Sequence, residues 1–282
     1  MSNGNAPPSS EYQDALAAVR EFWDAQACGE VYAGGAVLPL PDQLEAQANA
    51  RFSLEPYLEP FARFREGRGQ EVLEIGVGMG ADHLRWAQHE PKRLVGIDLT
   101  SRAVQFTRSR LRQHGLRPEL LIGNAELLPF ADNSFDIVYS WGVLHHSPRT
   151  DKALGEVYRV LRPGGQARIM IYHRPSVVGL MLWARYALLA GHPRRTLTDI
   201  YAEHMESPGT KGYTLAEAER MLASFREVHT QVQLSFGDLL LGAAGQRHQG
   251  LLLSAARRLW PRWVVQRFLS KLGLALLIDA RK

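Results

Sequence analysis

Glu71-Val72-Leu73-Glu74-Ile75-Gly76-Val77-Gly78-Met79-Gly80-Ala81 is the stretch that decides the fold of this chain. Its apolar run from Val72 to Ile75 predicts a buried parallel strand. The three alternating glycines then predict a tight turn into a helix that begins near Ala81. Such a turn lets a ligand approach the backbone where a side chain would block it. The stretch therefore indicates a nucleotide-type binding loop.

This loop does not by itself identify a ligand. Gly76, Gly78 and Ala81 also satisfy the dinucleotide fingerprint G-x-G-x-x-G/A, so a nicotinamide cofactor stays open at this point.

The composition predicts an ordinary globular protein. Of the 282 residues, 45% are apolar and 22% are charged. The single cysteine, Cys28, excludes an intramolecular disulfide and suits a cytoplasmic location, which we expect. Residues 1–10 predict a polar, disordered tail without the pattern of a signal peptide, and residues 11–66 predict a helical lid region.

The chain carries a net charge of +4, but the charge is unevenly placed. Residues 251–282 hold seven basic residues and one acidic residue, so the rest of the chain is slightly acidic in sum. No basic run interleaved with aromatic residues follows the rest of the sequence, and we expect no nucleic-acid partner. Residues 251–271 are basic, apolar and rich in tryptophan, a pattern that fits either peripheral membrane contact or packing on the protein itself.

After the glycine loop, strands and helices alternate. Strands are predicted at Glu71–Ile75, Leu94–Asp98, Glu119–Ile122, Asp136–Ser140 and Ala167–Tyr172, with helices at Ala81–His89, Ser101–His114 and Asp151–Leu161 between them. This alternation predicts an α/β protein with a parallel sheet whose ligands bind at the carboxyl ends of the strands. Gly76, Asp98, Asn124 and Trp141 all fall at such ends. Asp98 follows Gly76 by 22 positions, where a carboxylate can accept hydrogen bonds from both hydroxyls of a ribose.

Two segments, 123–130 (GNAELLPF) and 133–146 (NSFDIVYSWGVLHH), distinguish between the possible cofactors. Together with Val72–Gly80 and Leu94–Thr100, they resemble the class I S-adenosylmethionine-dependent methyltransferases, in the branch that includes the ubiquinone and menaquinone biosynthesis enzymes. The resemblance implies a Rossmann-like sheet of seven strands whose last strand is antiparallel, with helices on both faces. It assigns residues 67–282 to the methyltransferase domain, with Val228–Leu234 and Gly273–Asp279 as the last strands and a helical cap insertion at about 175–212. A nicotinamide dehydrogenase is disfavoured by the same two segments.

The resemblance also implies which residues bind S-adenosylmethionine. Glu74 and the backbone around Gly76, Gly78 and Gly80 would hold the methionine end, and Asp98 would bind the ribose.

At the adenine end, the resemblance implies packing by Leu99 and hydrogen bonds from Asn124 and the Ala125 amide. Glu126 would be a structural partner in that loop, and Trp141 would line the passage between the methyl group and the acceptor. The family usually has an acidic residue where this chain has Asn124, whose amide oxygen can still accept the hydrogen bond from the adenine amino group.

His145 and His146 are the candidate general bases, because they follow the fourth strand beside the predicted transfer point and histidines titrate near neutral pH. Each could equally be a pocket wall. The histidine and cysteine spacings match no metal site, so we expect no metal.

The acceptor pocket is predicted to lie between the N-terminal helices and the cap. Its candidate residues are Phe22, Trp23, Tyr32, Tyr172, His173, Trp183 and Glu203. The apolar cap helix at Ser176–Ala190 favours a lipophilic acceptor.

The sequence thus predicts methyl transfer to O, N or C of a small lipophilic metabolite such as a quinone, terpenoid or polyketide. The alternative is a protein of the same fold that binds the cofactor but catalyses a rearrangement or cyclisation. The oligomeric state, monomer or homodimer, stays open.

Overall fold

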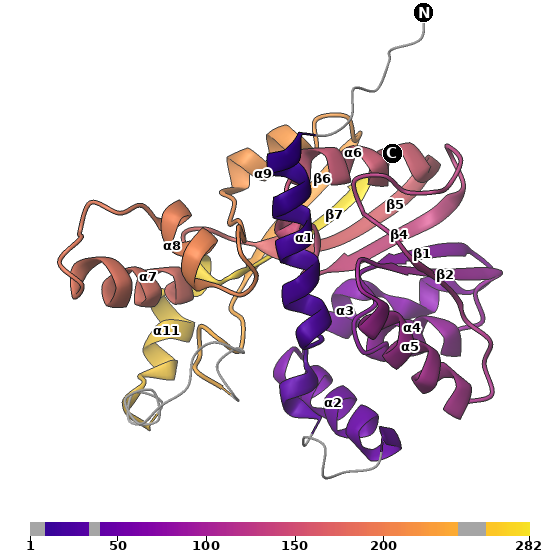
Figure 1. Ribbon diagram of the computed structural model, residues 1–282, viewed down its shortest axis with the longest axis horizontal. Helices are drawn as coiled ribbons and strands as arrows, with labels where there is room; N and C mark the ends of the chain where they lie inside the picture. The colour runs from indigo at the N-terminus through magenta and orange to yellow at the C-terminus, as the bar shows by residue number, and fades with distance from the viewer. Residues whose placement is uncertain (1–8, 34–39, 242–257) are drawn as a thin grey trace, which may run out of the picture.

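A seven-stranded sheet forms the centre of the protein (Figure 1). The computed structural model describes residues 9–33, 40–241 and 258–282. The strand order is β3-β2-β1-β4-β5-β7-β6. The strands are β1 (Glu71–Ile75), β2 (Arg93–Asp98), β3 (Glu119–Ile122), β4 (Phe135–Trp141), β5 (Leu161–Tyr172), β6 (Glu227–Gln233) and β7 (Ala275–Arg281).

The pairing confirms the predicted fold class. Strands β1 to β5 pair in parallel, whereas β7 runs antiparallel to both β5 and β6. The strand order reverses on either side of β1, where β2 and β4 lie next to it. Loops that leave the carboxyl ends of β1, β2 and β4 therefore diverge around a crevice, the usual ligand position in open parallel sheets.

Helices cover both faces of the sheet. On one face, α6 (Thr150–Val160) and α9 (Leu215–Met221) bury apolar side chains against the strands. On the other face, α3 (Leu58–Ala62) and α4 (Ala81–Gln88) do the same, with Trp86 fully buried. Helix α5 (Ser101–Gln113) lies beside α4 and next to β2 and β3. The central strands β1 and β4 are thus covered on both faces, which explains their apolar runs.

The N-terminal region is helical, as expected from the sequence. Helix α1 (Ser10–Ala25) runs across the front of the sheet, followed by η1 (Glu30–Tyr32) and α2 (Leu40–Leu54), and η3 (Phe64–Gly67) precedes β1 (Figure 1). Most of the predicted tail, residues 1–8, lies outside the described residues.

A lateral lobe extends from the far end of the sheet (Figure 1). We define it as residues 177–204 and 258–272. It contains α7 (Val177–Trp183), the π-helical turn η5 (Ala184–Leu188), α8 (Leu197–His204), α11 (Arg262–Phe268) and η6 (Ser270–Leu272). Val177 of α7 and Val265 of α11 pack in one buried cluster, which joins the two parts. Within the described residues, no helix is both long and apolar enough to cross a membrane.

Several predicted boundaries were wrong. Strand β5 begins at Leu161, not Ala167, because Pro163-Gly164-Gly165 forms an irregularity inside the strand where it pairs with β4. Glycine at 164 supplies the required positive φ of 82°. Helix α1 is capped by Ser9, whose side chain accepts from the backbone N–H of Tyr12. Thr150 does not cap α6 with its side chain, because its hydroxyl donates to Leu144 O instead.

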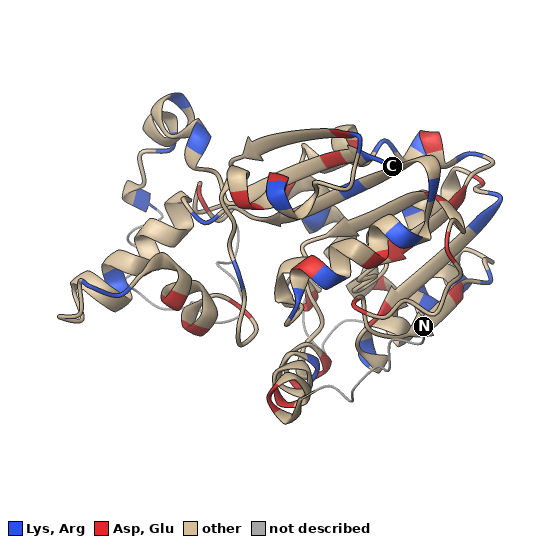
Figure 2. Ribbon diagram, turned by 90° about the horizontal axis from the view of Figure 1, so that it is seen from above, with Lys and Arg blue, Asp and Glu red and all other residues tan. Residues whose placement is uncertain are grey.

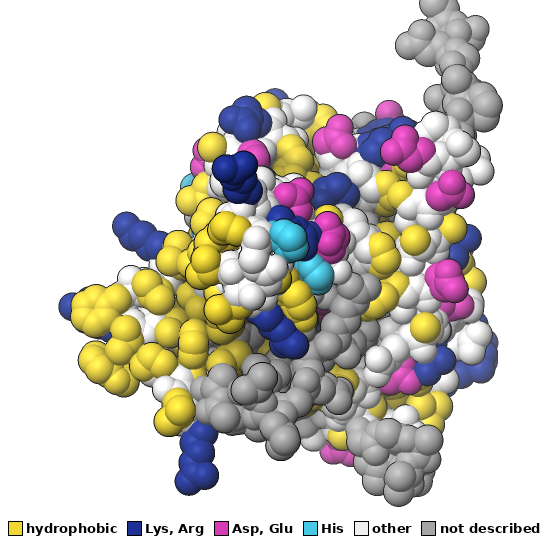
Figure 3. All heavy atoms as spheres, turned by 60° about the vertical axis from the view of Figure 1, so that its left-hand side comes forward, with side chains coloured by type: hydrophobic (Ala, Val, Ile, Leu, Met, Phe, Trp, Pro, Cys, Tyr) yellow, Lys and Arg dark blue, Asp and Glu magenta, His cyan; other side chains and the backbone are white. Residues whose placement is uncertain are grey.

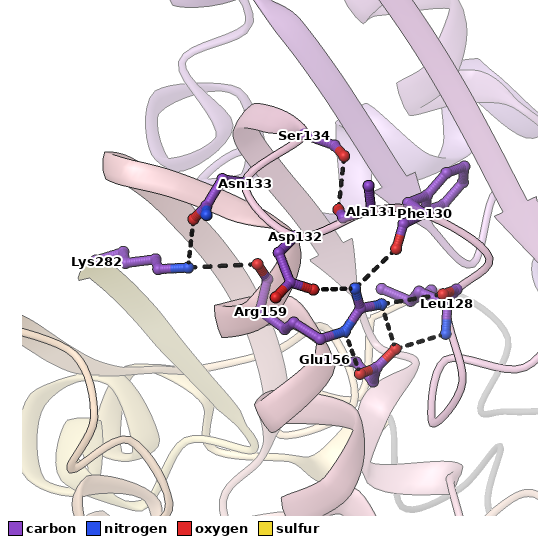
Figure 4. A network of polar contacts seen from close by, with 9 residues as sticks. All are labelled: Leu128, Phe130, Ala131, Asp132, Asn133, Ser134, Glu156, Arg159 and Lys282. Atoms are coloured by element: carbon purple, nitrogen blue, oxygen red, sulfur yellow. Dashed lines mark hydrogen bonds and ion pairs between the residues drawn. The ribbon is translucent and has the colours of Figure 1, made fainter. Parts of the chain in front are cut away.

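An arginine on α6 fixes the segment between β3 and β4 (Figure 4). Arg159 donates to the carbonyl oxygens of Leu128 and Phe130, at 3.0 and 2.7 Å, and forms ion pairs with Asp132 and Glu156. Glu156 in turn accepts from the backbone N–H of Leu128. These contacts hold the long connection against α6, so the residues directly after β3 have a fixed position at the crevice.

Candidate functional site

An open cavity lies at the carboxyl ends of β1, β2 and β4, with about 1060 Å³ of empty space that includes solvent at its mouth. Most of the predicted cofactor residues line it, namely Glu74, Gly76, Gly78, Gly80, Asp98, Leu99, Asn124, Ala125 and Trp141. Of the predicted acceptor-side residues, Trp23 and His146 line it as well. Four segments that are far apart in the sequence therefore meet at one cavity.

The glycine loop has the geometry that its sequence predicts. Gly76, Gly78 and Gly80 all have positive φ, at 83°, 51° and 78°. A Cβ at Gly76 would lie 2.1 Å from Cγ2 of Val143, so only glycine fits there. A Cβ at Gly78 would meet nothing within 4 Å. Because Gly78 lines the cavity, its missing side chain leaves the backbone open to a ligand.

Two side chains from α5 hold this loop in place. Thr107 donates a hydrogen bond to Gly78 O, and the buried Arg110 donates to Met79 O at 2.7 Å. Arg110 also donates to Leu44 O and to the side chain of Gln47, both on α2. The loop is thus tied to α5 and to the N-terminal region together. Burial lowers the pKa of Arg110 to about 10, which leaves it charged at neutral pH.

Glu74 lies at the end of β1 beside a histidine. One of its carboxylate oxygens is 2.8 Å from Nδ1 of His83, and both side chains are buried. Burial raises the pKa of Glu74 well above its ordinary value and lowers the pKa of His83 to about 3. His83 is therefore neutral. Glu74 faces the cavity, where a bound cation would favour the ionised carboxylate.

Asp98 bridges the glycine loop and α5. Its Oδ2 accepts from the backbone N–H of Gly78 at 3.2 Å, and its Oδ1 accepts from the backbone and the hydroxyl of Thr100. Burial raises the pKa of Asp98, and these hydrogen bonds oppose that shift. Oδ2 keeps acceptor capacity, since a carboxylate has about two lone-pair sites on each oxygen and Oδ2 accepts this one hydrogen bond. Thr100 itself caps α5.

Asn124 contacts the lid helix. Its side-chain amide donates to the hydroxyl of Tyr12 on α1 at 2.9 Å, and its Oδ1 accepts from the backbone N–H of Glu126. Glu126 lies outside the cavity lining and is almost completely buried. Although burial opposes ionisation, hydrogen bonds from Ser147 and Arg149 lower the pKa of Glu126. Tyr12, which the sequence analysis did not select, thus joins α1 to the loop after β3.

One face of α1 covers the cavity. Leu16, Val19 and Trp23 line it, and Tyr12 lies four residues before Leu16. Residues at this spacing share one side of a helix. The helix therefore lies over the cavity from the Asn124 end to His146, whose ring is 5.1 Å from that of Trp23.

A buried charge cluster closes the side of the cavity next to α2. Arg51 donates to both carboxylate oxygens of Asp82 at 2.6 Å and forms an ion pair with Glu55. Asp82 also accepts from the hydroxyl of Tyr139. Asp82 and Glu55 raise the pKa of Arg51 despite its burial. Arg51 and Asp82 line the cavity, although the sequence analysis selected neither.

The two neighbouring histidines have different surroundings. His146 lines the cavity, with Nδ1 at 2.8 Å from the hydroxyl of Ser207 and 3.1 Å from that of Thr210. His145 is completely buried behind it, outside the lining, and its ring stacks on Tyr172 at 3.9 Å. Burial lowers the pKa of His145 well below its ordinary value.

The segment after α8 brings a carboxylate to His146. Nε2 of His146 lies 3.4 Å from Oε2 of Glu206, which also accepts a hydrogen bond from the Tyr172 hydroxyl at 2.8 Å. Ser207 and Thr210 belong to the same segment. Sequence analysis selected the neighbouring Glu203, which instead forms an ion pair with Arg195 and is 58% exposed.

The other predicted acceptor-pocket residues lie outside the cavity lining. Phe22 packs edge-on against Trp23, and Tyr32 packs toward Phe236. Trp183 donates through its indole N–H to Arg195 O. The remaining two are behind the lining: Tyr172 contacts His145 and Glu206 as described, and the buried His173 lies 3.1 Å from Gly273 O.

Part of the chain matches a known family. Residues 73–169 match the family described as Methyltransferase domain, which confirms the resemblance for that part of the chain. A fatty-acid O-methyltransferase of Mycolicibacterium smegmatis is 40% identical over 116 residues, 41% of each chain. An erythromycin 3''-O-methyltransferase of Saccharopolyspora erythraea is 40% identical over 101 residues, 34% of this chain and 33% of that protein. The chain thus spans less than half the length of these curated relatives.

Solved structures share the fold. A phosphoethanolamine N-methyltransferase 2 of Haemonchus contortus, in complex with phosphomonomethylethanolamine and S-adenosylhomocysteine, superposes with a TM-score of 0.61 at 18% identity. The superposition covers 94% of this chain and 60% of that one. At this identity the likeness shows the fold alone.

Proposed function

We propose that this chain, whose residues 73–169 carry a methyltransferase domain, binds S-adenosylmethionine in the cavity and transfers its methyl group to a small lipophilic acceptor. The observation that carries the proposal is the convergence of the glycine loop, Asp98 and Asn124 on one cavity. Gly78 presents open backbone there, and Asp98 keeps free acceptor capacity, so the residues present fit this cofactor.

The methionine end of the cofactor would lie at the end of β1. Backbone N–H groups of the glycine loop are suited to a carboxylate, and Glu74 is suited to the ammonium group. Arg51 lies on the same cavity wall, where its charge is already paired with Asp82 and Glu55.

The nucleoside end would lie toward β2 and β3. Asp98 would accept hydrogen bonds from the ribose hydroxyls, and Leu99 would pack on the adenine. Asn124 and the Ala125 amide would bind the adenine edge, with Asn124 held by Tyr12. Because Tyr12 belongs to α1, closure of this helix and binding of the adenine would be coupled.

When bound, the cofactor supplies an electrophilic methyl group on a positively charged sulfonium. The protein then has mainly to hold an acceptor in line and to exclude water, and such positioning can contribute about 7–11 kcal/mol. Trp23 and Trp141 would form the apolar walls of the passage.

His146 is proposed as the residue that accepts a proton from the acceptor. It lines the cavity, whereas His145 lies behind it. A proton taken up by His146 would be stabilised by the Glu206 carboxylate at 3.4 Å, with Ser207 and Thr210 holding the ring. A hydroxyl or enol acceptor would use this base. We assign His145 a packing role.

The acceptor is proposed to be small and lipophilic. Leu16, Val19, Trp23 and Trp141 give the cavity apolar walls. Curated relatives are named for a fatty acid and for erythromycin, which supports an apolar acceptor without choosing among quinone, terpenoid and polyketide. The alternative of a rearrangement or cyclisation is not favoured, because these relatives are named as methyltransferases.

Mass spectrometry tests the reaction. The purified chain is incubated with S-adenosylmethionine carrying a deuterated methyl group and with pools of quinone, fatty-acid and polyketide acceptors. Transfer gives an acceptor heavier by one labelled methyl group, together with S-adenosylhomocysteine. A product isomeric with its substrate, formed without S-adenosylhomocysteine, would instead support the rearrangement.

A further inference from the structure

The lateral lobe exposes an unusual amount of apolar surface. Six large hydrophobic side chains on it are at least 45% exposed: Leu180, Leu188, Leu189, Leu259, Trp263 and Phe268. Figure 3, in which this side of the molecule comes forward, shows hydrophobic side chains gathered over the lobe with Lys and Arg at its edges. An exposed apolar patch rimmed by polar groups is a mark of an interaction surface.

These side chains are not part of the packing of the lobe itself. Val177 and Val265 join α7 to α11, and Leu182 packs with α8 residues in a second buried cluster. By contrast, Trp263 is 70% exposed and Phe268 is 67% exposed. The helices therefore already have their internal contacts, and the exposed residues form a second, outward face.

The charged side chains around this face are mostly positive. The stretches 175–198 and 258–278 contain no acidic residue. Exposed basic side chains of the lobe are Arg185, Arg194, Arg258, Arg267 and Lys271. The exposed acids of the lobe are on α8, where Glu203 pairs with Arg195 and Asp199 accepts hydrogen bonds from the N-cap Thr196. Figure 2 shows blue residues distributed over the lobe and red ones confined to a short part of it.

We propose that the outward face of the lateral lobe docks the protein on an anionic membrane surface, with Trp263 and Phe268 inserted at the interface and Arg267 and Lys271 on the lipid headgroups. Apolar side chains, tryptophan and basic residues in one surface are the combination that binds anionic bilayers. Each basic side chain near such a surface strengthens binding by about fivefold.

A second copy of the chain fits this face less well. A two-fold interface would bring the same patch of each copy together and set Arg267 and Lys271 opposite equivalent cations. Like charges in that arrangement oppose association.

The lobe is directly connected to the cavity. Helix α8 ends at His204, and the next residues include Glu206 and Ser207, which contact His146. The docking proposal does not depend on the reaction, and it is tested without any turnover.

Vesicle co-sedimentation of the full chain tests the docking. Vesicles of phosphatidylcholine alone are compared with vesicles that also contain phosphatidylserine. We expect stronger binding to the anionic vesicles that weakens as salt is added. The double variant W263S/F268S should bind them at least about tenfold more weakly. The variant R267Q/K271Q, which keeps the apolar face, should lose about fivefold per charge.

Ile122→Ser on β3 is the matched control, because Ile122 is also exposed, at 58%, but lies outside the lobe. It should bind like the wild type, and thermal unfolding should show that all variants fold. The proposal is overturned if the wild type does not sediment with anionic vesicles, or if W263S/F268S sediments as well as the wild type. It is also overturned if light scattering shows that W263S/F268S converts a wild-type dimer into a monomer, since the face would then be a subunit interface.

Discussion

Nε2 of His146 lies 3.4 Å from a carboxylate oxygen of Glu206, and the same oxygen accepts a hydrogen bond from Tyr172. The imidazole is thus held between the cap segment and the cavity. Its Nδ1 faces the hydroxyls of Ser207 and Thr210, so Nε2 is the nitrogen directed toward the carboxylate.

Replacement of His146 should impair turnover without loss of the cofactor site. On a hydroxyl acceptor, we expect His146→Asn to lower kcat by about 10²- to 10⁴-fold, the usual contribution of a general base. Binding of S-adenosylhomocysteine, measured by calorimetry, should change little. His145→Asn is the control, and an equal loss of kcat in both variants would contradict the assignment to His146.

Glu206 is proposed to act through His146 as a positioning residue. Glu206→Gln should lower kcat less than His146→Asn does, because the base remains. An equal loss of kcat in both variants would contradict this assignment, and a loss accompanied by reduced thermal stability would indicate a purely structural role.

Two glycines of the same loop should respond differently to alanine. Gly76→Ala should lower the free energy of unfolding by about 2–5 kcal/mol, because its Cβ would clash with Val143 and φ is positive. Gly78→Ala should cost only about 1–2 kcal/mol in stability but weaken cofactor binding, because its Cβ points into open space at the cavity. Gly155→Ala on α6, with no atom within 4 Å, is the control and should stabilise the protein slightly. Unimpaired cofactor binding by Gly78→Ala would contradict the proposed position of the ligand.

His145 should make the protein sensitive to mild acid. Burial lowers its folded pKa, whereas the unfolded chain takes up the proton near pH ~6.5. The unfolded state therefore binds more protons below that pH, and the free energy of unfolding should fall with decreasing pH by up to about 1.4 kcal/mol per unit. His145→Phe should lose this part of the slope in urea unfolding curves measured at a series of pH values. Equal slopes for wild type and variant would show that His145 is not held neutral.

The hydrogen bond between Tyr12 and Asn124 should stabilise the closed lid. Tyr12→Phe removes the hydrogen bond to Asn124, worth about 1 kcal/mol, so cofactor affinity should fall by about fivefold. Tyr158→Phe on α6, outside the cavity lining, should have no effect on affinity. If both variants bind the cofactor like the wild type, α1 does not take part in adenine binding.

The sheet and the cofactor loop could be predicted from local patterns. Three such patterns are short and local in the sequence. They are the apolar run before Gly76, the acid at the end of the second strand and the stretch after Gly123. Pro163-Gly164-Gly165 shows the limit of local patterns, because residues typical of a turn also fit an irregularity within β5.

The acceptor side could not be predicted in this way. Arg51 lines the cavity, and Tyr12 and Glu206 contact the cavity-lining residues Asn124 and His146. All three come from segments remote from the sheet motifs, and their positions depend on tertiary packing. Glu206 is three residues beyond the predicted Glu203. Because α8 ends at His204 and the backbone turns at Met205, the two carboxylates face different surroundings.

The most direct test of the account is calorimetric binding of S-adenosylmethionine, S-adenosylhomocysteine and NADH to the wild type and to Asp98→Ala, with thermal unfolding to confirm that the variant folds. We predict that both sulfur compounds bind the wild type, that NADH does not, and that Asp98→Ala loses at least about tenfold in affinity because hydrogen bonds to a charged group are removed. Binding of NADH without binding of either sulfur compound would contradict the assignment of the cavity to S-adenosylmethionine.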